Sequence, residues 1–142
     1  KLMKKNIIIS YHPETLDLKS SKKNFTEILK ALESLKETLI IFTMPNSDEG
    51  SEFIFTHIKK FLKRKKNSYL IKSLGQRRFF SCLKYFDFII GNSSSGIIEM
   101  PSFNKATINI GSRQNGRVRN KTIIDVDGNS KKIIPTKSTI VL

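Results

Sequence analysis

Six short apolar runs recur along the chain, each bounded by polar residues, glycine or proline. A continuous apolar run of about four to eight residues is typical of a strand buried on both faces of a parallel sheet. Two of the runs stop at a proline, which cannot donate a hydrogen bond within a central strand. The pattern predicts strands at Lys5–His12, Thr38–Pro45, Ser68–Leu74, Asp87–Gly91, Ala106–Gly111 and Thr122–Val126.

Helical patterns lie between these runs. Apolar residues return at the period of an amphipathic helix after Ser20, a plausible N-cap, and again in two later segments. Strand and helix therefore alternate, which predicts an α/β fold: a Rossmann-like three-layer domain with a parallel sheet and right-handed crossovers. The stripes are Phe25, Ile28, Leu29, Leu32 and Leu35, then Ile54, Ile58, Phe61 and Leu62, then Phe79, Leu83 and Phe86.

The chain has 142 residues, of which 38% are hydrophobic, so it is the size of a single domain with its own core. The stretch after Asp127 predicts a loop followed by a final strand at Thr139–Leu142. Pro135 argues against a long closing helix there.

The formal net charge of +14 admits two readings. A domain this basic attracts polyanions, so a nucleic-acid-binding module is one alternative. However, the basic residues of Lys59–Lys66 fall opposite Ile58 and Phe61 on one predicted helix, and no aromatic residues interleave with them as in base-stacking proteins. We therefore interpret most of the charge as solvated helix faces and do not expect nucleic acid as the partner.

The single Cys82 cannot form an internal disulfide, which favours a reducing compartment. No apolar run reaches the length of a membrane span, and no signal peptide is evident. We expect a cytoplasmic protein without a membrane partner.

The stretch GNSSSG, residues 91–96, follows a predicted strand and opens a short helix expected at Ile97–Met100. Ligands of open parallel sheets bind at the carboxyl ends of strands, and the first amides of a helix suit a phosphate. Ser93, Ser94 and Ser95 would add hydroxyl donors, while Gly91 and Gly96 would admit the ligand because they lack a Cβ. The alternative is a serine-capped turn.

Glu99 follows this loop by one helical turn. A carboxylate pointing at phosphates would repel them, but it can accept hydrogen bonds from a sugar diol, as acids do in nucleotide-binding α/β folds. The alternative is a solvent-exposed carboxylate. After the next strand come Arg113, Arg117 and Arg119, whose guanidinium groups suit phosphate oxygens; an exposed basic loop is the alternative.

His12 ends the first predicted strand and is either structural or part of a site. Because parallel strands end at one edge of a sheet, we expect Glu14, Asn46, Asp48 and Glu49 to converge on the same edge. We expect His57, within a helix, to be structural. No metal-ligand spacing is present, so neither a metal nor a cofactor is expected.

Four motifs in this order, YHPET, PNSDEG, GNSSSGIIEMPSF and INIGSRQNGRVR, resemble the C-terminal half of the hydrolysing UDP-N-acetylglucosamine 2-epimerases. The match runs from Lys5 to Val126. The resemblance implies one half of a glycosyltransferase-B-type fold, with residues 1–142 forming the nucleotide-binding domain and an N-terminal partner domain absent from the chain. It also implies UDP or a UDP-sugar as ligand and a homo-oligomer as the full enzyme.

The resemblance carries over residue by residue. It implies that the residues matching Ser93, Ser94 and Glu99 bind the nucleotide, with the glutamate on the ribose. Arg113 matches a nucleotide-binding arginine and His12 an active-site histidine. Further residues of the same loops complete the candidate set: Ser95 and Gly96 for the nucleotide, and Asn46, Asp48, Gln114 and Arg117 for the cleft.

The implied reaction releases UDP and N-acetylmannosamine, or a 4-acetamido-6-deoxy analogue, by elimination and then hydration. Preorganised donors would stabilise the charge on the leaving UDP. A glycosyltransferase of the same fold is the alternative, which a strict dependence on an acceptor would reveal. Because the partner domain would supply carboxylates for the sugar chemistry, we expect the isolated domain to be inactive. The sequence does not choose between uridine and guanosine.

Overall fold

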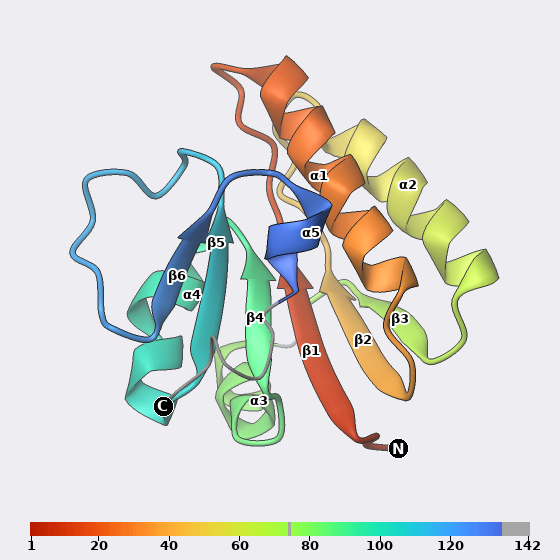
Figure 1. Cartoon of the computed structure of the whole chain (residues 1–142), viewed down its shortest axis with the longest axis vertical. Coiled ribbons are helices and arrows are strands. Elements are labelled where there is room, and N and C mark those ends of the chain that lie inside the picture. The colour runs from red at the N-terminus through yellow and green to blue at the C-terminus, as the bar shows by residue number, and fades with distance from the viewer. Residues whose placement is uncertain (74, 135–142) are drawn as a thin grey trace.

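The computed structural model describes residues 1–73 and 75–134. In these residues six parallel strands form one sheet in the order β3-β2-β1-β4-β5-β6 (Figure 1). All the strands point toward the edge that is uppermost in Figure 1, so their carboxyl ends share one rim. The strands are β1 (Lys5–Ser10), β2 (Thr38–Thr43), β3 (Ser68–Ile71), β4 (Phe88–Gly91), β5 (Ala106–Ile110) and β6 (Ile123–Val126).

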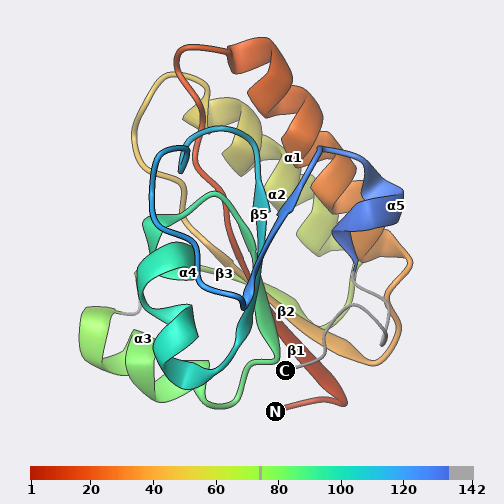
Figure 2. The same cartoon turned by 60° about the vertical axis from the view of Figure 1, so that its left-hand side comes forward.

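Helices cover both faces of the sheet, which confirms the three-layer prediction. Figure 2 shows α1, α2 and α5 on one side and α3 and α4 on the other. The elements of the first layer are α1 (Leu18–Glu33), α2 (Ser51–Arg64) and α5 (Ser130–Ile133). Those of the second are α3 (Gly75–Leu83), α4 (Ser94–Ile98) and the 3₁₀ helix η1 (Met100–Phe103).

The central strand β1 is continuously apolar because it is buried on both faces of the sheet. Ile7 and Ile9 pack into the cluster beneath α1 and α2, whereas Ile8 between them packs into the cluster on the α3 side. Successive side chains of a strand point to opposite faces, so a sheet covered on both faces needs apolar residues at every position. The predicted parallel sheet is therefore confirmed, with two separate apolar layers.

The strands end earlier than their apolar runs suggest. β1 stops at Ser10 and β2 at Thr43, so His12 and Pro45 belong to loops at the rim. The tail differs too, because the helix α5 occupies part of the stretch where we expected only a loop. Its Asn129 caps the helix by accepting a hydrogen bond from the Lys131 amide, at 3.1 Å. Leu74, Pro135 and the expected strand Thr139–Leu142 lie outside the described residues.

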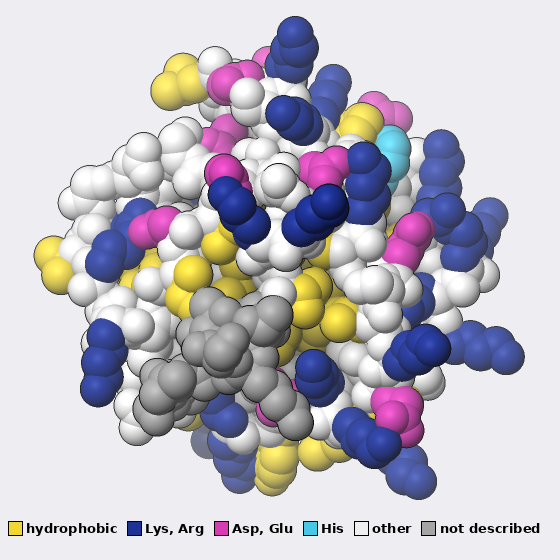
Figure 3. Space-filling view, viewed as in Figure 1, with side chains coloured by type: hydrophobic (Ala, Val, Ile, Leu, Met, Phe, Trp, Pro, Cys, Tyr) yellow, Lys and Arg dark blue, Asp and Glu magenta, His cyan; other side chains and the backbone are white. Residues whose placement is uncertain are grey.

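The basic residues are dispersed on the face of the molecule that Figure 3 shows. In Figure 3 the lysine and arginine side chains do not gather in one patch, although several follow the helix α2. Lys59, Lys60 and Lys63 lie on the exposed side of this helix, opposite Ile58 and Phe61, which are buried. No helix among residues 1–73 and 75–134 combines the length and apolarity needed to cross a membrane.

The order of the strands reverses between β1 and β4. From β1 the chain moves outward through β2 to β3, then returns to place β4 on the other side of β1. The crevice above such a reversal is where open α/β sheets bind their ligands. The loops after β1 and β4 flank this point.

Gly91, the last residue of β4, allows β1 and β4 to approach at this reversal. Its φ of +145° is disfavoured for other residues, and a Cβ there would collide with the carbonyl oxygen of Ser10. The glycine is therefore required by the sheet itself.

Replacing this glycine should cost more than replacing a glycine in open space. We expect Gly91→Ala to lower the free energy of unfolding by about 3 kcal/mol, from backbone strain and the collision together. Gly116→Ala is the matched control, because Gly116 also has a positive φ, of +81°, but nothing lies within 4 Å of a Cβ there. Its cost should be about 1 kcal/mol. Equal losses for the two variants in urea denaturation would contradict this account.

Candidate active site

The side chain of Asn92 joins the loops after β1 and β4. Its Oδ1 accepts a hydrogen bond from the His12 amide at 2.8 Å, and its Nδ2 donates to the His12 carbonyl oxygen at 2.8 Å. The Asn92 amide donates to the Ser10 carbonyl oxygen at 3.1 Å. The residue is fully buried, at 0% exposure. Its carboxamide thus pairs with the backbone of His12 as a neighbouring strand would.

The carbonyl oxygen of Asn92 holds a third loop, the one after β5. It accepts hydrogen bonds from Gln114 Nε2 at 2.8 Å and from Arg113 Nη1 at 3.3 Å. Gln114 is only 2% exposed, so it supports the site from inside the protein. We did not predict a role for Asn92. Its position in the sequence could have suggested this role, because Asn92 directly follows a strand and precedes the serines. There a carboxamide can replace the backbone hydrogen bonds that are lost where the strand ends.

The serine loop begins a helix earlier than expected. Helix α4 starts at Ser94, not near Ile97, with Ser93 as its N-cap. The Ser93 hydroxyl accepts a hydrogen bond from the Ser95 amide at 3.4 Å, so the alternative of a serine-capped turn is correct for this residue. Ser93, Ser94 and Ser95 are all partly exposed at the rim.

Position 96 requires glycine for a structural reason, and not for the access of a ligand that we expected. Its amide donates to the Ser93 carbonyl oxygen at 3.2 Å, and its carbonyl oxygen accepts from Thr107 Oγ1 at 2.6 Å. A Cβ at Gly96 would lie 2.7 Å from Thr107 Cγ2. The missing side chains of Gly91 and Gly96 therefore make room for β1 and β5, not for a ligand.

A hollow of about 440 Å³ lies where these loops meet the ends of β1, β2 and β3. Glu99 lines it, and its Oε2 is buried without a hydrogen-bond partner among the described residues. Ser93, Ser94 and Arg113 are not part of this lining. The structure therefore brings Glu99 together with some of the predicted residues and not with others. The lining comprises Ser10, His12, Thr43, Met44, Lys72, Ser73, Gly75, Phe79, Ser95 and Glu99.

His12 is fixed in the hollow by the loop after β2. Its Nδ1 accepts a hydrogen bond from the Asn46 amide at 3.1 Å, and the Asn46 side chain donates to Asp48. Burial and the positive charge of Arg113 lower the pKa of His12 from 6.5, although the Asn46 side chain and the negative charge of Asp48 partly offset them. His12, Asn46 and Asp48 thus converge as predicted.

Glu14 and Glu49, two other acids of this rim, do not converge with His12 as we expected. Glu14 points away from His12, because its carboxylate accepts hydrogen bonds from the Ser112 amide at 3.1 Å and hydroxyl at 2.7 Å. Glu49 is exposed.

His57, which we expected to be structural, stacks on Phe53 within α2, with ring centroids 3.9 Å apart.

The three loop arginines have different surroundings. Arg113 and Arg117 are exposed at the rim. Arg119 instead holds its own loop, because its Nε donates to Asp125 at 3.0 Å and its Nη1 donates to the Gln114 carbonyl oxygen at 2.9 Å. Our grouping of Arg119 with the phosphate-binding arginines was wrong for this reason.

The pKa of His12 provides a test of this geometry. Burial and Arg113 both disfavour the imidazolium, so the pKa of His12 measured by NMR titration should lie below 6.5. Arg113→Ala should raise this pKa, because it removes a repelling positive charge. Arg117→Ala, in the same loop, should leave it unchanged. A pKa at or above 6.5, or equal shifts in both variants, would show that Arg113 does not face His12.

A family model described as UDP-N-acetylglucosamine 2-epimerase matches residues 1–141. The chain is 42% identical over 134 residues to the "Polysialic acid biosynthesis protein P7" of Escherichia coli. It is also 42% identical over 132 residues to the "GDP/UDP-N,N'-diacetylbacillosamine 2-epimerase (hydrolyzing)" of Campylobacter jejuni. These alignments cover 94% and 91% of the chain, respectively.

Solved structures show the same fold. The UDP-GlcNAc 2-epimerase of Neisseria meningitidis, solved bound to UDP-GlcNAc, superposes with a TM-score of 0.70 at 17% identity, over 91% of this chain and 34% of that one. The chain likewise spans about a third of the length of the curated relatives it matches, 34% in both cases. Because the family model extends over nearly all of its residues, the chain belongs to the UDP-N-acetylglucosamine 2-epimerase family.

Proposed function

We propose that this chain is the nucleotide-sugar-binding domain of a hydrolysing UDP-N-acetylglucosamine 2-epimerase. The observation that carries the proposal is the carboxylate of Glu99, which has an unpartnered buried oxygen in a hollow shared with His12 and Ser95. This hollow lies at the reversal of strand order in a chain of the epimerase family. The substrate is UDP-N-acetylglucosamine or a 4-acetamido-6-deoxy analogue.

Glu99 binds the ribose in this proposal. A buried carboxylate oxygen without a donor is costly, so a ligand that supplies hydroxyl groups there gains the full hydrogen bond. A ribose diol offers two such groups side by side. Phe79 lines the same hollow and supplies an aromatic face for the base. The base itself, uracil or guanine, is left open.

The diphosphate lies at the serine loop. Ser93, Ser94 and Ser95 offer hydroxyl groups, and the Ser94 amide, at the first position of α4, has no acceptor within the helix. The exposed Arg113 and Arg117 add charge that does not titrate away. Donors fixed in place before the reaction stabilise charge that grows on the leaving UDP.

Two residues of our candidate set act indirectly. Gly96 uses its amide and its carbonyl oxygen within the protein. Gln114 donates to Asn92 and is buried, so it positions the loop that carries Arg113. Neither contacts the nucleotide in this proposal.

His12 acts as a hydrogen-bond donor. Because Nδ1 accepts from the Asn46 amide, a neutral ring carries its proton on Nε2. The lowered pKa keeps the ring neutral at neutral pH. A neutral imidazole does not readily lose a second proton, so His12 orients the leaving diphosphate or the sugar. Asn46 and Asp48 hold the ring in this orientation.

The remaining steps need residues from elsewhere in the protein. We propose that an N-terminal domain supplies the carboxylates for elimination across C1 and C2 of the sugar and for the later addition of water. UDP and the 2-epimeric sugar are the products. Turnover then requires the complete protein, which we expect to be a homo-oligomer, and the isolated chain binds nucleotide without converting it.

Calorimetric titration with UDP tests the site. We expect saturable binding to the chain, and a loss of roughly tenfold or more in affinity for Glu99→Gln and for Arg113→Ala, because each removes a charge-assisted hydrogen bond. Glu49→Gln, which neutralises an exposed carboxylate on the same rim, is the matched control and should bind like the wild type.

The fold of each variant should first be verified by circular dichroism. Absence of heat at millimolar UDP with an intact fold would contradict the proposal. Wild-type affinity in both Glu99→Gln and Arg113→Ala would show that the nucleotide binds elsewhere.

A further inference from the structure

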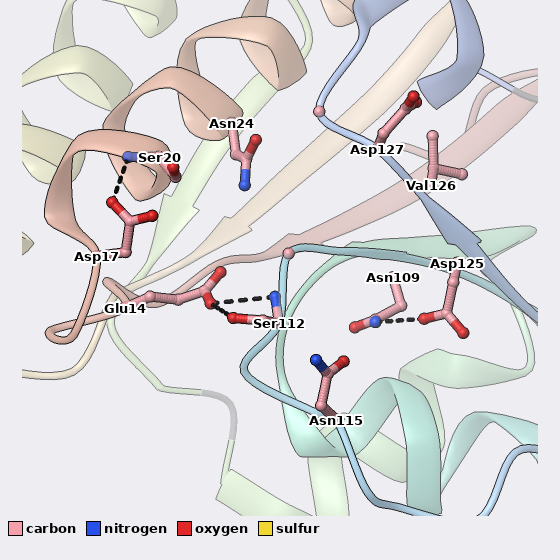
Figure 4. Close-up of a pocket in the computed structure, with 12 residues that line it drawn as sticks. Glu14, Asp17, Ser20, Asn24, Asn109, Ser112, Asn115, Asp125, Val126 and Asp127 are labelled. Atoms are coloured by element: carbon pink, nitrogen blue, oxygen red, sulfur yellow. Dashed lines mark hydrogen bonds between the residues drawn. The ribbon is translucent and has the colours of Figure 1, made fainter.

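A second hollow, of about 530 Å³, opens on the other side of the β1–α1 loop (Figure 4). It lies between the start of α1 and the carboxyl ends of β5 and β6, and it shares no lining residue with the hollow of Glu99. The described residues that line it include four carboxylates and no lysine or arginine, in a chain whose net charge is +14. The polar side chains that matter are Glu14, Asp17, Asn24, Asn109, Asp125 and Asp127.

Asn109 presents a buried acceptor to this hollow. The residue is 2% exposed, and its Nδ2 donates to Asp125 Oδ1 at 2.6 Å, which fixes the orientation of the carboxamide. Its Oδ1 has no hydrogen-bond partner among the described residues. Figure 4 shows this oxygen turned away from Asp125 and toward Ser112. A buried acceptor of this kind calls for a donor.

Glu14 presents a second acceptor. Its Oε2 is engaged by Ser112, but its Oε1 is buried and unpartnered among the described residues. Gly111, with φ +88°, makes room for it, because a Cβ at this position would collide with Glu14 Oε1. The backbone is thus shaped around an oxygen for which no residue of 1–73 or 75–134 supplies a donor.

The charges around these acceptors are only partly balanced. Asp125 is paired with Arg119 and Asp127 with Lys132, both at 3.0 Å. Burial opposes ionisation of Asp125, but its hydrogen bonds to Arg119 and Asn109 and the charge of Arg119 lower its pKa, so it is ionised. Asp17 caps helix α1 by accepting from the Ser20 amide at 3.0 Å. Glu14 forms no ion pair within the described part of the chain.

The occupant should therefore be a cation that donates hydrogen bonds. A directly ligated metal ion does not fit, because no three His, Cys, Asp or Glu residues among those described are arranged to hold one. We propose that this acidic hollow binds a primary ammonium group, on a small amine or on a lysine side chain. Its N–H groups donate to Glu14 Oε1 and Asn109 Oδ1, and its charge offsets Glu14 and Asp17. The inference is independent of the nucleotide site.

The test is a titration of the ¹⁵N-labelled chain with n-butylammonium chloride, followed by amide NMR. We expect saturable shifts of the Ser112 amide and the Asn109 carboxamide. Tetramethylammonium carries the same charge but no N–H donor, so it should not produce saturable shifts. Equal responses to the two cations, or no saturable shift with either, would overturn the proposal.

Variants locate the site. Glu14→Gln should weaken n-butylammonium binding roughly tenfold, because it removes the central charge. Since Glu14 also anchors Ser112, Asp17→Asn serves as a second variant: asparagine caps helices as well as aspartate, and only the charge is lost. It should weaken binding several-fold. Glu49→Gln is the matched control and should have no effect. Wild-type binding in both Glu14→Gln and Asp17→Asn would overturn the proposal.

A further titration distinguishes the two sources of the ammonium group. Tighter binding of Nα-acetyl-lysine methylamide than of n-butylammonium would identify a lysine side chain as the ligand, whereas equal binding would identify the ammonium group alone. The Asn109 carboxamide distinguishes the two sites: UDP should leave it unshifted, because Asn109 lines only the acidic hollow, whereas the Ser112 amide lies next to Arg113. Failure of either site would therefore leave the other intact.

Discussion

The buried carboxamide of Asn92 is the contact on which the geometry of the rim depends. Where β1 and β4 end, the ladder of backbone hydrogen bonds can no longer hold the chain. Asn92 replaces it, with both side-chain groups on the backbone of His12 and its carbonyl oxygen shared by Gln114 and Arg113. Buried polar groups must be paired, so the two bonds to His12 fix the loop after β1, and the bonds from Gln114 and Arg113 fix the loop after β5. Three segments that are distant in the sequence thereby acquire fixed relative positions.

Two of the hollows along this rim differ in character. One contains Glu99 and His12 and lies over the reversal of strand order. The other is acidic and lies toward β5 and β6. Between the two hollows, Glu14 in the loop after β1 accepts hydrogen bonds from Ser112 in the loop after β5, which joins these two loops. In our two proposals, a domain with excess positive charge binds an anionic nucleotide in the first hollow and a cation in the second.

The apolar patterns were sufficient to predict the sheet and its layers, because residues buried on both faces are apolar at every position. The ends of the strands were less predictable. β1 ends at Ser10 and β2 at Thr43, inside their apolar runs, and beyond Ser10 the chain is held by Asn92 of a neighbouring loop. Residue type was enough to single out His12 and Glu99, which line one hollow in the structure, and their roles stay predictions. Roles set by tertiary contacts were not, since Arg119 resembles Arg113 in sequence but pairs with Asp125, and Gly96 accommodates Thr107.

The most direct measurement is a crystal structure of the chain with UDP bound. The account predicts the ribose hydroxyls within hydrogen-bonding distance of Glu99 Oε2 and the diphosphate against Ser93, Ser94 and Ser95, with the Asn92 hydrogen bonds unchanged. UDP in the hollow of Glu14 and Asn109, or UDP bound on the rim with Glu99 turned away from it, would contradict the account.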